Sequence, residues 1–241
     1  MSIPLQNEIH YPESDGRPMG ETEIHALVLE DLRFALVRRY ADVPDVYVWG
    51  NLFLYYREGD PKACVAPDVF LVRGVGKRTD NRRRTYKLWE EGGRVPSLVI
   101  ELTSESTRDE DVQKKRLYER LGVEEYFLFD PFGEYARPRL QGFRLEEGRY
   151  QQLVQRVDGA LESRTTGLIL KPEGRELRLV DKETGEVLLN AAEADEARLS
   201  AEVRARQEAE ARQAAEERAS LAEDRLRTLE EEMKRLRERP R

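Results

Sequence analysis

The feature that most constrains the fold is a change in composition near Asn190. From Ala191 onward Ala, Glu and Arg dominate, glycine is absent, and no proline occurs before Pro240. This composition is typical of a long solvated helix or a coiled coil. The sequence therefore predicts two parts, a folded body over residues 1–189 and a charged helical tail over residues 190–241.

The end of this tail carries the 4-3-4-3 apolar spacing of a coiled-coil seam. The residues that follow this spacing are Ala222, Leu226, Leu229, Met233 and Leu236. Upstream, Glu208 and Arg212 fall on core positions of the same seam. We expect a lone helix near 191–215 and a weak pairing segment near 219–239, through which a homodimer could form. The alternative is a frayed, exposed tail.

Composition also limits the compartment and the kind of site. The chain has 241 residues, of which 37% are charged and 39% hydrophobic, and no apolar run approaches the ~18–20 residues that span a bilayer. No signal peptide opens the sequence, so we expect a cytoplasmic protein without a membrane partner. A single cysteine, Cys64, and two histidines exclude a disulfide framework and a Cys/His structural zinc site. The net charge of -7 argues against coating nucleic acid by bulk positive charge, but leaves a local basic stripe open.

Within the body, short and nearly continuous apolar runs are typical of central strands that are covered on both faces. Such runs are Val65–Val72, Ser97–Thr103 and Glu125–Asp130. Val46–Tyr56 predicts two further strand pieces, or one long strand with a bulge. Hairpin turns are expected at Glu147-Gly148, Glu173-Gly174 and Thr184-Gly185.

Two helices are expected beside this sheet. Apolar residues spaced along one face over 24–36 indicate the first. Thr107 and Glu110 form a capping box, which predicts that the second begins just after Thr107, and Gly122 is its expected end. Together the patterns predict an α/β fold, with helices flanking a mixed sheet.

Two of the expected strands each contain one carboxylate, Asp68 in V-A-P-D-V-F-L-V and Glu101 in L-V-I-E-L-T. An ionised carboxylate in a covered sheet is costly unless it is paired or binds a metal. Each acid could instead lie at a strand end and face solvent. Two such acids on neighbouring strands favour a shared site.

Lys114 lies three, four and seven residues before apolar positions of the second helix, so it shares the face that packs on the sheet. Lys115 is rotated from it by about 100° and is expected to point outward. We interpret Lys114 as an ammonium aimed at Asp68 and Glu101. The alternatives are a lysine at the helix edge with its stem buried, or a purely structural ion pair.

Two carboxylates and a lysine, without histidine, suit phosphodiester hydrolysis assisted by a hard cation such as Mg²⁺ or Mn²⁺. Glycoside hydrolysis also uses two carboxylates, but the chain shows no array of sugar-stacking residues. A basic stripe follows the Asp68 strand and could contact a nucleic-acid backbone, or form a solvated loop. Its residues are Lys77, Arg78, Arg82, Arg83, Arg84 and Lys87, with Tyr86 and Trp89 interleaved.

These residues resemble a known family. The runs A-P-D-V-F, P-S-L-V-I-E-L-T-S-E-S-T-R and D-V-Q-K-K-R-L-Y-E-R-L-G-V-E-E-Y-F-L-F-D-P are similar to the Uma-type putative restriction endonuclease family, part of the PD-(D/E)XK nuclease superfamily. The resemblance covers roughly Tyr11–Gln155 and is most specific from Pro96 to Pro131. It implies a restriction-endonuclease-like core with a divalent-metal nuclease site.

By position, the resemblance implies that Asp68 and Glu101 are metal ligands, with the Leu102 carbonyl as a further one. The lysine of the usual E-x-K motif would fall at Thr103, and the family is similar in having its lysine on the following helix, at Lys114. Glu105 stands where many members of the family have proline. Lys115 is an alternative to Lys114 as the lysine of the site. Glu21 or Glu23 is a candidate for an additional acid from the first helix.

We therefore expect a Mg²⁺- or Mn²⁺-dependent endonuclease that acts on DNA as a homodimer, with Arg82, Arg83, Arg84 and Lys87 contacting nucleic acid. The alternative is a catalytically inactive protein of the nuclease fold that binds nucleic acid or assembles with other proteins. A third hypothesis is a coiled-coil adaptor whose folded body only caps the tail.

Overall fold

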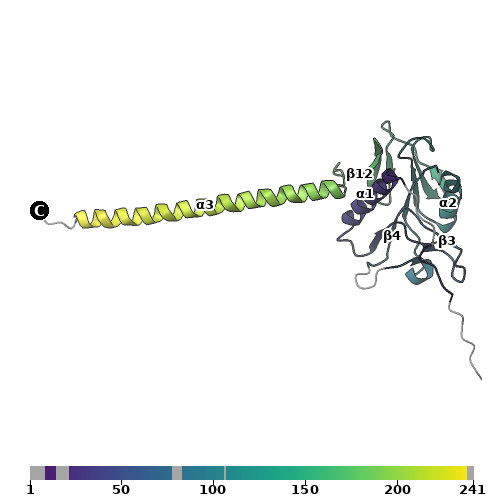
Figure 1. Ribbon diagram of the computed structural model, residues 1–241, viewed down its shortest axis with the longest axis horizontal. Coiled ribbons are helices and arrows are strands. Elements are labelled where there is room, and N and C mark those ends of the chain that lie inside the picture. Colours follow the sequence, from purple (N-terminus) through teal and green to yellow (C-terminus); the bar gives the residue numbers. More distant parts are fainter. Residues whose placement is uncertain (1–8, 15–21, 78–82, 106, 238–241) are drawn as a thin grey trace, which may run out of the picture. The chain divides into compact units, whose positions relative to one another are not determined.

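The computed structural model describes residues 9–14, 22–77, 83–105 and 107–237 (Figure 1). By its internal contacts the chain divides into two compact units, residues 1–191 and 192–241. The first unit has a central sheet with helix α1 on one face and helix α2 on the other (Figure 1). This arrangement confirms the predicted α/β fold with a mixed sheet.

The central sheet has six strands in the order β1-β4-β6-β7-β8-β9. Their bounds are β1 Val46–Trp49, β4 Val69–Arg73, β6 Leu98–Leu102, β7 Glu125–Phe129, β8 Leu140–Glu146 and β9 Arg149–Gln152. β6 and β7 pair in parallel, and the other neighbours in this sheet pair antiparallel. A parallel pair needs a crossover connection, which α2 supplies between β6 and β7.

Two smaller sheets complete the first unit. One has the order β3-β2-β5, with β2 at Leu54–Tyr55, β3 at Cys64–Val65 and β5 at Tyr86–Lys87, and the 3-10 helix η1 (Leu88–Glu91) follows it. The other is antiparallel, with β10 at Leu161–Ser163, β11 at Leu168–Glu173 and β12 at Glu176–Asp181. The sequence patterns did not predict β5 or β10, because two or three residues are too few to show a period.

Helix α1 spans Glu23–Arg39 and begins where the Thr22 hydroxyl accepts a hydrogen bond from the backbone N–H of His25, at 3.3 Å. Its apolar residues, Leu32 and Leu36 among them, pack in one core cluster with the sheet face that carries Val69 and Leu71. The predicted first helix is therefore present, and its apolar face is the one that is buried.

Helix α2 spans Arg108–Leu121, and it begins after Thr107 as predicted. Gly122 ends it with a left-handed backbone at φ 88°, which glycine adopts without strain. The predicted capping box is wrong. Thr107 has helical backbone angles, and its hydroxyl accepts a hydrogen bond from the Ser104 N–H at 2.9 Å, on the side away from the helix.

The two faces of the central sheet alternate along each strand. On β4, Val69 and Leu71 belong to the cluster that contains α1, whereas Phe70 and Val72 belong to the cluster that contains Tyr118 of α2. Side chains in a strand point alternately to opposite faces, so this division follows directly from the pleat. On β6, Val99 lies on the α2 side, and Glu101, two residues on, faces the same helix.

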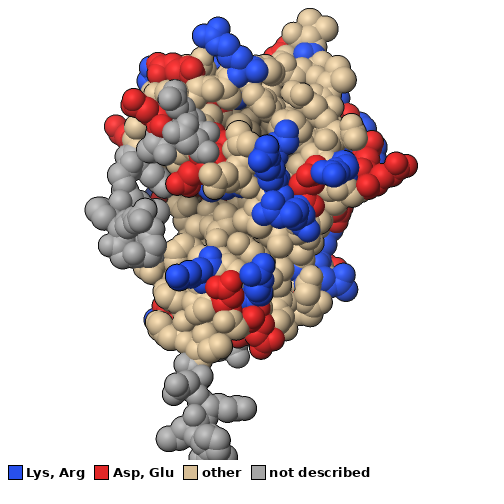
Figure 2. All heavy atoms as spheres, turned by 90° about the vertical axis from the view of Figure 1, so that its right-hand side faces the viewer, with Lys and Arg blue, Asp and Glu red and all other residues tan. Residues whose placement is uncertain are grey.

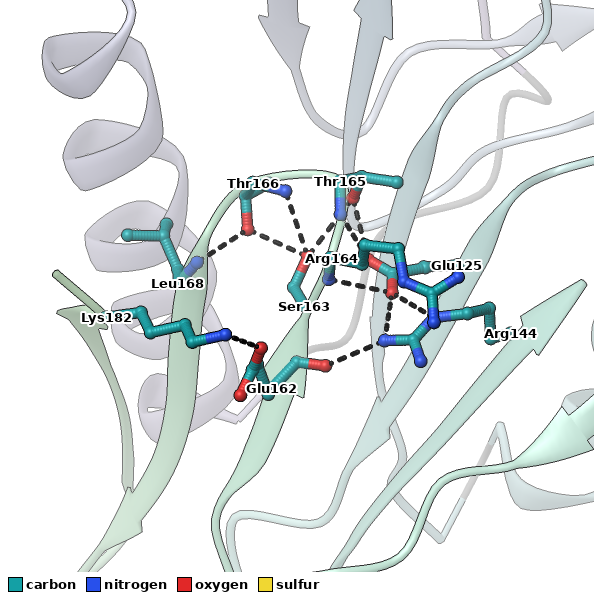
Figure 3. Close-up of polar contacts among 9 residues, drawn as sticks. All are labelled: Glu125, Arg144, Glu162, Ser163, Arg164, Thr165, Thr166, Leu168 and Lys182. Atoms are coloured by element: carbon teal, nitrogen blue, oxygen red, sulfur yellow. Dashed lines mark hydrogen bonds and ion pairs between the residues drawn. The ribbon is translucent and has the colours of Figure 1, made fainter.

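One buried acid joins the β10–β12 sheet to the central sheet (Figure 3). Glu125, at the start of β7, accepts hydrogen bonds from the Ser163 hydroxyl at 2.6 Å, the Thr165 hydroxyl at 2.7 Å, the Arg164 N–H at 2.9 Å and the Arg144 Nε at 2.9 Å. Burial raises the pKa of Glu125, but the hydrogen bonds from Ser163, Arg164 and Thr165 lower it by more, so the carboxyl titrates below its usual range. The buried Glu125 carboxylate therefore fixes the loop between β10 and β11 to the central sheet.

Helix α3 spans Ala191–Arg237 without interruption. One continuous helix covers both the expected lone helix near 191–215 and most of the expected pairing segment near 219–239, and the pairing itself stays a prediction. Ion pairs between residues four apart stabilise its exposed surface, such as Arg206 with Glu210 at 2.9 Å and Arg212 with Glu216 at 2.8 Å. Over the residues described, no helix has the length and apolar content needed to span a bilayer.

Substituting Gly142 tests the packing between β8, β7 and β10. A Cβ at this position would lie 2.8 Å from atoms of Leu161 and Phe127, and Phe127 is fully buried and cannot move aside. We expect Gly142→Ala to destabilise the fold by about 1–3 kcal/mol. Gly76→Ala is the control, because a Cβ there meets nothing within 4 Å, and its change should stay within about 0.5 kcal/mol. Urea unfolding of both variants measures the difference, and equal stability would contradict this packing.

Candidate functional site

Asp68 lies just before β4, where the sheet brings it beside the end of β6. Its Oδ2 accepts a hydrogen bond from the Leu102 N–H at 2.7 Å. The same oxygen lies 3.7 Å from Nε2 of His25 on α1. The residue is 8% exposed, so its carboxylate is held by the fold and is not a solvated strand end.

Glu101 lies on β6, is 1% exposed, and uses both carboxylate oxygens. Oε2 pairs with the Lys114 ammonium at 2.8 Å, and Oε1 accepts a hydrogen bond from the Tyr118 hydroxyl at 2.5 Å. Lys114 and Tyr118 are four residues apart on α2, so one helix face supplies both donors. The predicted convergence of one lysine and Glu101 is therefore present in the structure.

The two acids differ in their pKa values. Burial raises the pKa of Glu101 to about 7, and the nearby charge of Asp68 adds to this effect against the opposing influence of Lys114. Burial also raises the pKa of Asp68, but His25, Lys114 and the Leu102 N–H lower it below its usual range. The pKa of Lys114 is raised by the two acids, so it stays an ammonium.

The raised pKa of Glu101 has a consequence for stability. Between pH 4.5 and about 7 the folded chain keeps a proton on Glu101 that the unfolded chain has released. The folded state therefore binds more protons in this range, so this group makes folding less favourable as the pH rises. Glu101 is thus an acid that the fold holds at a cost in stability.

Thr103 stands where the resemblance would place the lysine of E-x-K. Its hydroxyl donates a hydrogen bond to Oδ2 of Asp111 at 2.5 Å, and Asp111 is 9% exposed. Burial raises the pKa of Asp111, against the effects of this hydrogen bond and of Lys114. Thr103 thus links the end of β6 to the first turn of α2, one turn before Lys114.

Lys115 takes a different position from Lys114. Its ammonium lies 3.4 Å from the centre of the Phe143 ring, on the surface of the core that contains β8. Burial lowers its pKa. Of the two neighbouring lysines, Lys114 is therefore the one that contacts the carboxylates.

The first helix contributes a residue that the sequence reasoning missed. His25 is buried and lies beside Asp68, whereas Glu23, one of the two proposed acids, is exposed at the first position of α1. Glu21, the other, lies outside the described residues. A signal for His25 was present, since it lies three, four and seven residues before Val28, Leu29 and Leu32 on the buried face.

The donors at this site are those that a hard divalent cation prefers. Asp68 and Glu101 supply carboxylate oxygens. The contacts of Asp68 with the Leu102 N–H and with His25 both involve its Oδ2 atom. Because the N–H and C=O of one residue in an extended strand point to the same edge, the Leu102 carbonyl faces the Asp68 side as well. Within the described ranges, no group of three or more His, Cys, Asp or Glu side chains is arranged to hold a metal. A Mg²⁺ site of two carboxylates, a carbonyl and waters needs no such group.

The basic stripe divides into buried and exposed members. The Arg83 side chain is 3% exposed, and its guanidinium forms two hydrogen bonds to Glu91 at 2.7 and 2.9 Å and lies over the Tyr47 ring at 4.3 Å from its centre. Arg83 therefore packs inside the fold and does not offer its charge to a nucleic acid. Arg84 is 78% exposed beside Glu13. Arg82 lies outside the described residues.

Among the described residues, the surface on the α2 side does not form one continuous basic area. Figure 2 shows blue and red side chains interspersed over it. Lys87 illustrates the pattern, since its ammonium lies 2.9 Å from Glu90 and 4.9 Å from the centre of the Tyr11 ring. Contacts to a polyanion would therefore be local.

Comparison with known proteins identifies the family. The model of the Uma2 family, described as putative restriction endonucleases, matches residues 2–173. This chain belongs to the Uma2 family. Membership supports a nuclease activity, with nucleic acid as the substrate. A similar solved structure is the crystal structure of a putative nuclease belonging to DUF820 from Anabaena variabilis, with 10% identity, a TM-score of 0.45, and coverage of 61% of this chain and 75% of that one. No curated protein matches the chain.

Removing one partner of the Glu101–Lys114 pair tests the energetics of the site. Lys114→Met leaves a buried carboxylate without its cation, so we expect a loss of about 3 kcal/mol at pH 7.5. Adding Glu101→Gln removes the remaining charge and should recover part of this loss. Urea unfolding in the presence of EDTA measures both.

Lys115→Met is the matched control. It removes a cation over an aromatic ring, which contributes about 1 kcal/mol or less. If Lys114→Met and Lys115→Met were equally stable, the buried pair would have no special role in the fold.

Proposed function

We propose that this chain is a divalent-metal-dependent endonuclease that hydrolyses phosphodiester bonds in DNA. The observation that carries the proposal is the buried pair of Glu101 with Lys114, next to Asp68, whose carboxylate accepts a hydrogen bond from the N–H of the residue after Glu101. Buried acids with pKa values shifted in opposite directions are typical of functional sites. The family supports the nuclease class, and the acids and the lysine support the metal-assisted mechanism.

The residues that would hold the metal are Asp68, Glu101 and the Leu102 carbonyl. When bound, Mg²⁺ or Mn²⁺ supplies a Lewis acid that polarises a phosphoryl oxygen and makes a bound water more acidic. Asp68 is the acid that is ionised throughout the neutral range, because its pKa is lowered. Its carboxylate is oriented by the Leu102 N–H, which donates to Oδ2.

Lys114 is the group that would act on the reacting atoms. It remains an ammonium at neutral pH, since its pKa is raised by the acids around it. A fixed ammonium orients an attacking water or stabilises the negative charge that develops on the phosphoryl group. Tyr118 does not move a proton in this scheme. It donates to Oε1 of Glu101 and so fixes the carboxylate.

One observation favours the second candidate, a nuclease fold that binds nucleic acid without cutting it. Both oxygens of Glu101 are already engaged, by Lys114 and by Tyr118, and the pKa of this acid is about 7. A cation must compete with these donors to bind. The two candidates differ in one measurable property, the metal-dependent cleavage of DNA.

Plasmid nicking tests the proposal. We expect Mg²⁺- or Mn²⁺-dependent nicking that falls by at least about 100-fold in Asp68→Ala and in Lys114→Ala, because each removes a group that acts on the transition state. Lys115→Met should keep its activity. Nicking that persists in both site variants would reject this assignment of residues.

Metal binding provides a readout that does not depend on activity. Crystals soaked in Mn²⁺ should show anomalous density between Asp68 and Glu101, and Asp68→Ala crystals should lack it. If the native protein bound Mn²⁺ there but cut no DNA, the non-cutting candidate would replace the first.

The basic stripe gives a separate prediction. Arg84→Ala with Lys87→Ala should weaken DNA binding and lower the slope of log K against log salt by about 0.9 for each phosphate that the variant no longer neutralises. Arg83→Ala should leave this slope unchanged and instead cost about 3 kcal/mol of stability, because it removes a buried guanidinium that donates two hydrogen bonds to Glu91. Binding titrations at several salt concentrations, with urea unfolding alongside, separate the two effects. A reduced salt slope in Arg83→Ala would contradict the buried position.

A further inference from the structure

The last third of α3 carries an apolar stripe that is open to solvent. Leu226, Leu229 and Met233 are 61%, 49% and 54% exposed. They continue the spacing of Ala219 and Ala222, so they occupy the alternating a and d positions of a heptad, with Leu226 at an a position and Leu229 at a d position. An exposed stripe of this width, limited to two positions in seven, is the narrow seam of a coiled coil.

The residues that flank this seam select the partner. Arg218 and Arg225 occupy successive g positions, and Glu223 and Glu230 occupy successive e positions. In a parallel, in-register pair, a g residue lies beside the e residue five positions later on the other chain. A second copy of this helix therefore brings Arg218 to Glu223 and Arg225 to Glu230, and each contact occurs twice in the pair.

The opposite orientation is disfavoured by the same residues. An antiparallel pair brings g positions beside g positions and e positions beside e positions. An antiparallel pair that overlaps this segment, with Leu226 layered against Leu229, places Glu223 beside Glu230, which are like charges, and only Arg225 beside Glu232 as opposite charges. Charge complementarity thus favours a parallel pair of identical helices over an antiparallel one.

We propose that α3 binds a second copy of this chain through a parallel, in-register, two-stranded coiled coil over residues 219–233. Two strands fit better than three or four, because both flanks of the seam are charged and larger bundles bury e and g positions as well. The segment is short, about 22 Å at 1.5 Å per residue. Upstream, Arg212 and Glu208 fall on core positions and limit the pairing to this end.

The pairing does not depend on the proposed nuclease function, and it also applies to a body that only binds nucleic acid. If the body does cut DNA, the pairing places two sites in one assembly, which is what cutting both strands of a duplex requires. A dimer that nicks nothing would leave this inference intact and remove the proposed function, so the two can fail separately.

Charge reversal on the full-length chain tests the orientation. Arg225→Glu alone sets Glu beside Glu, and Glu230→Arg alone sets Arg beside Arg, so each single variant should raise the dissociation constant about tenfold. Mixing the two single variants restores both attractive contacts, so the mixture should dimerise like the native chain. The double variant Arg225→Glu/Glu230→Arg should also recover. Sedimentation velocity over a range of concentrations measures all four, and circular dichroism checks that α3 stays helical.

Cross-linking gives an independent measurement of register. In a Cys64→Ser background, Leu229→Cys places one thiol in the seam, so oxidation should link two chains through the same residue. Thr228→Cys, one residue away and outside the seam, is the matched control and should link poorly. Equal cross-linking of both variants, a native chain that sediments as a monomer or as a larger oligomer, or mixing that restores nothing would each overturn the proposal.

Discussion

The arrangement of the site depends on one buried carboxylate, Glu101, between the central sheet and α2. A carboxylate without solvent is stable only when donors satisfy it, and α2 brings Lys114 and Tyr118 to its two oxygens. A buried ion pair seldom stabilises a fold more than apolar residues of the same size would. The pair is therefore better explained by chemistry at this position than by stability.

The contacts around Glu101 also fix the position of α2. Thr103 and Asp111 link the end of β6 to the first turn of the helix, and Tyr118 packs against Tyr126 on the neighbouring strand. Because α2 is the crossover between two parallel strands, its place over the sheet is already limited by topology. The polar contacts then set its rotation, so that Lys114 faces the acids and Lys115 faces Phe143.

The sequence predicted the parts of the site that lie on periodic elements. Lys114 could be placed because a helix repeats every 3.6 residues. Asp68 and Glu101 were found because an acid stands out in an apolar run. His25 was missed although its spacing along α1 carried the signal. Arg83 could not be predicted, because its burial depends on Tyr47 and Glu91 from other elements, and a run of charges does not show which member turns inward.

Two buried glutamates on neighbouring strands differ in how fully the fold satisfies their carboxylates. Glu125 on β7 is surrounded by hydroxyl, N–H and guanidinium donors, and its pKa is lowered. Glu101 on β6 has two donors and a second acid nearby, and its pKa is raised to about 7. A cation placed beside Asp68 and Glu101 would favour their ionised forms. The fold thus satisfies one acid fully, and leaves the other in an environment that a bound cation would stabilise.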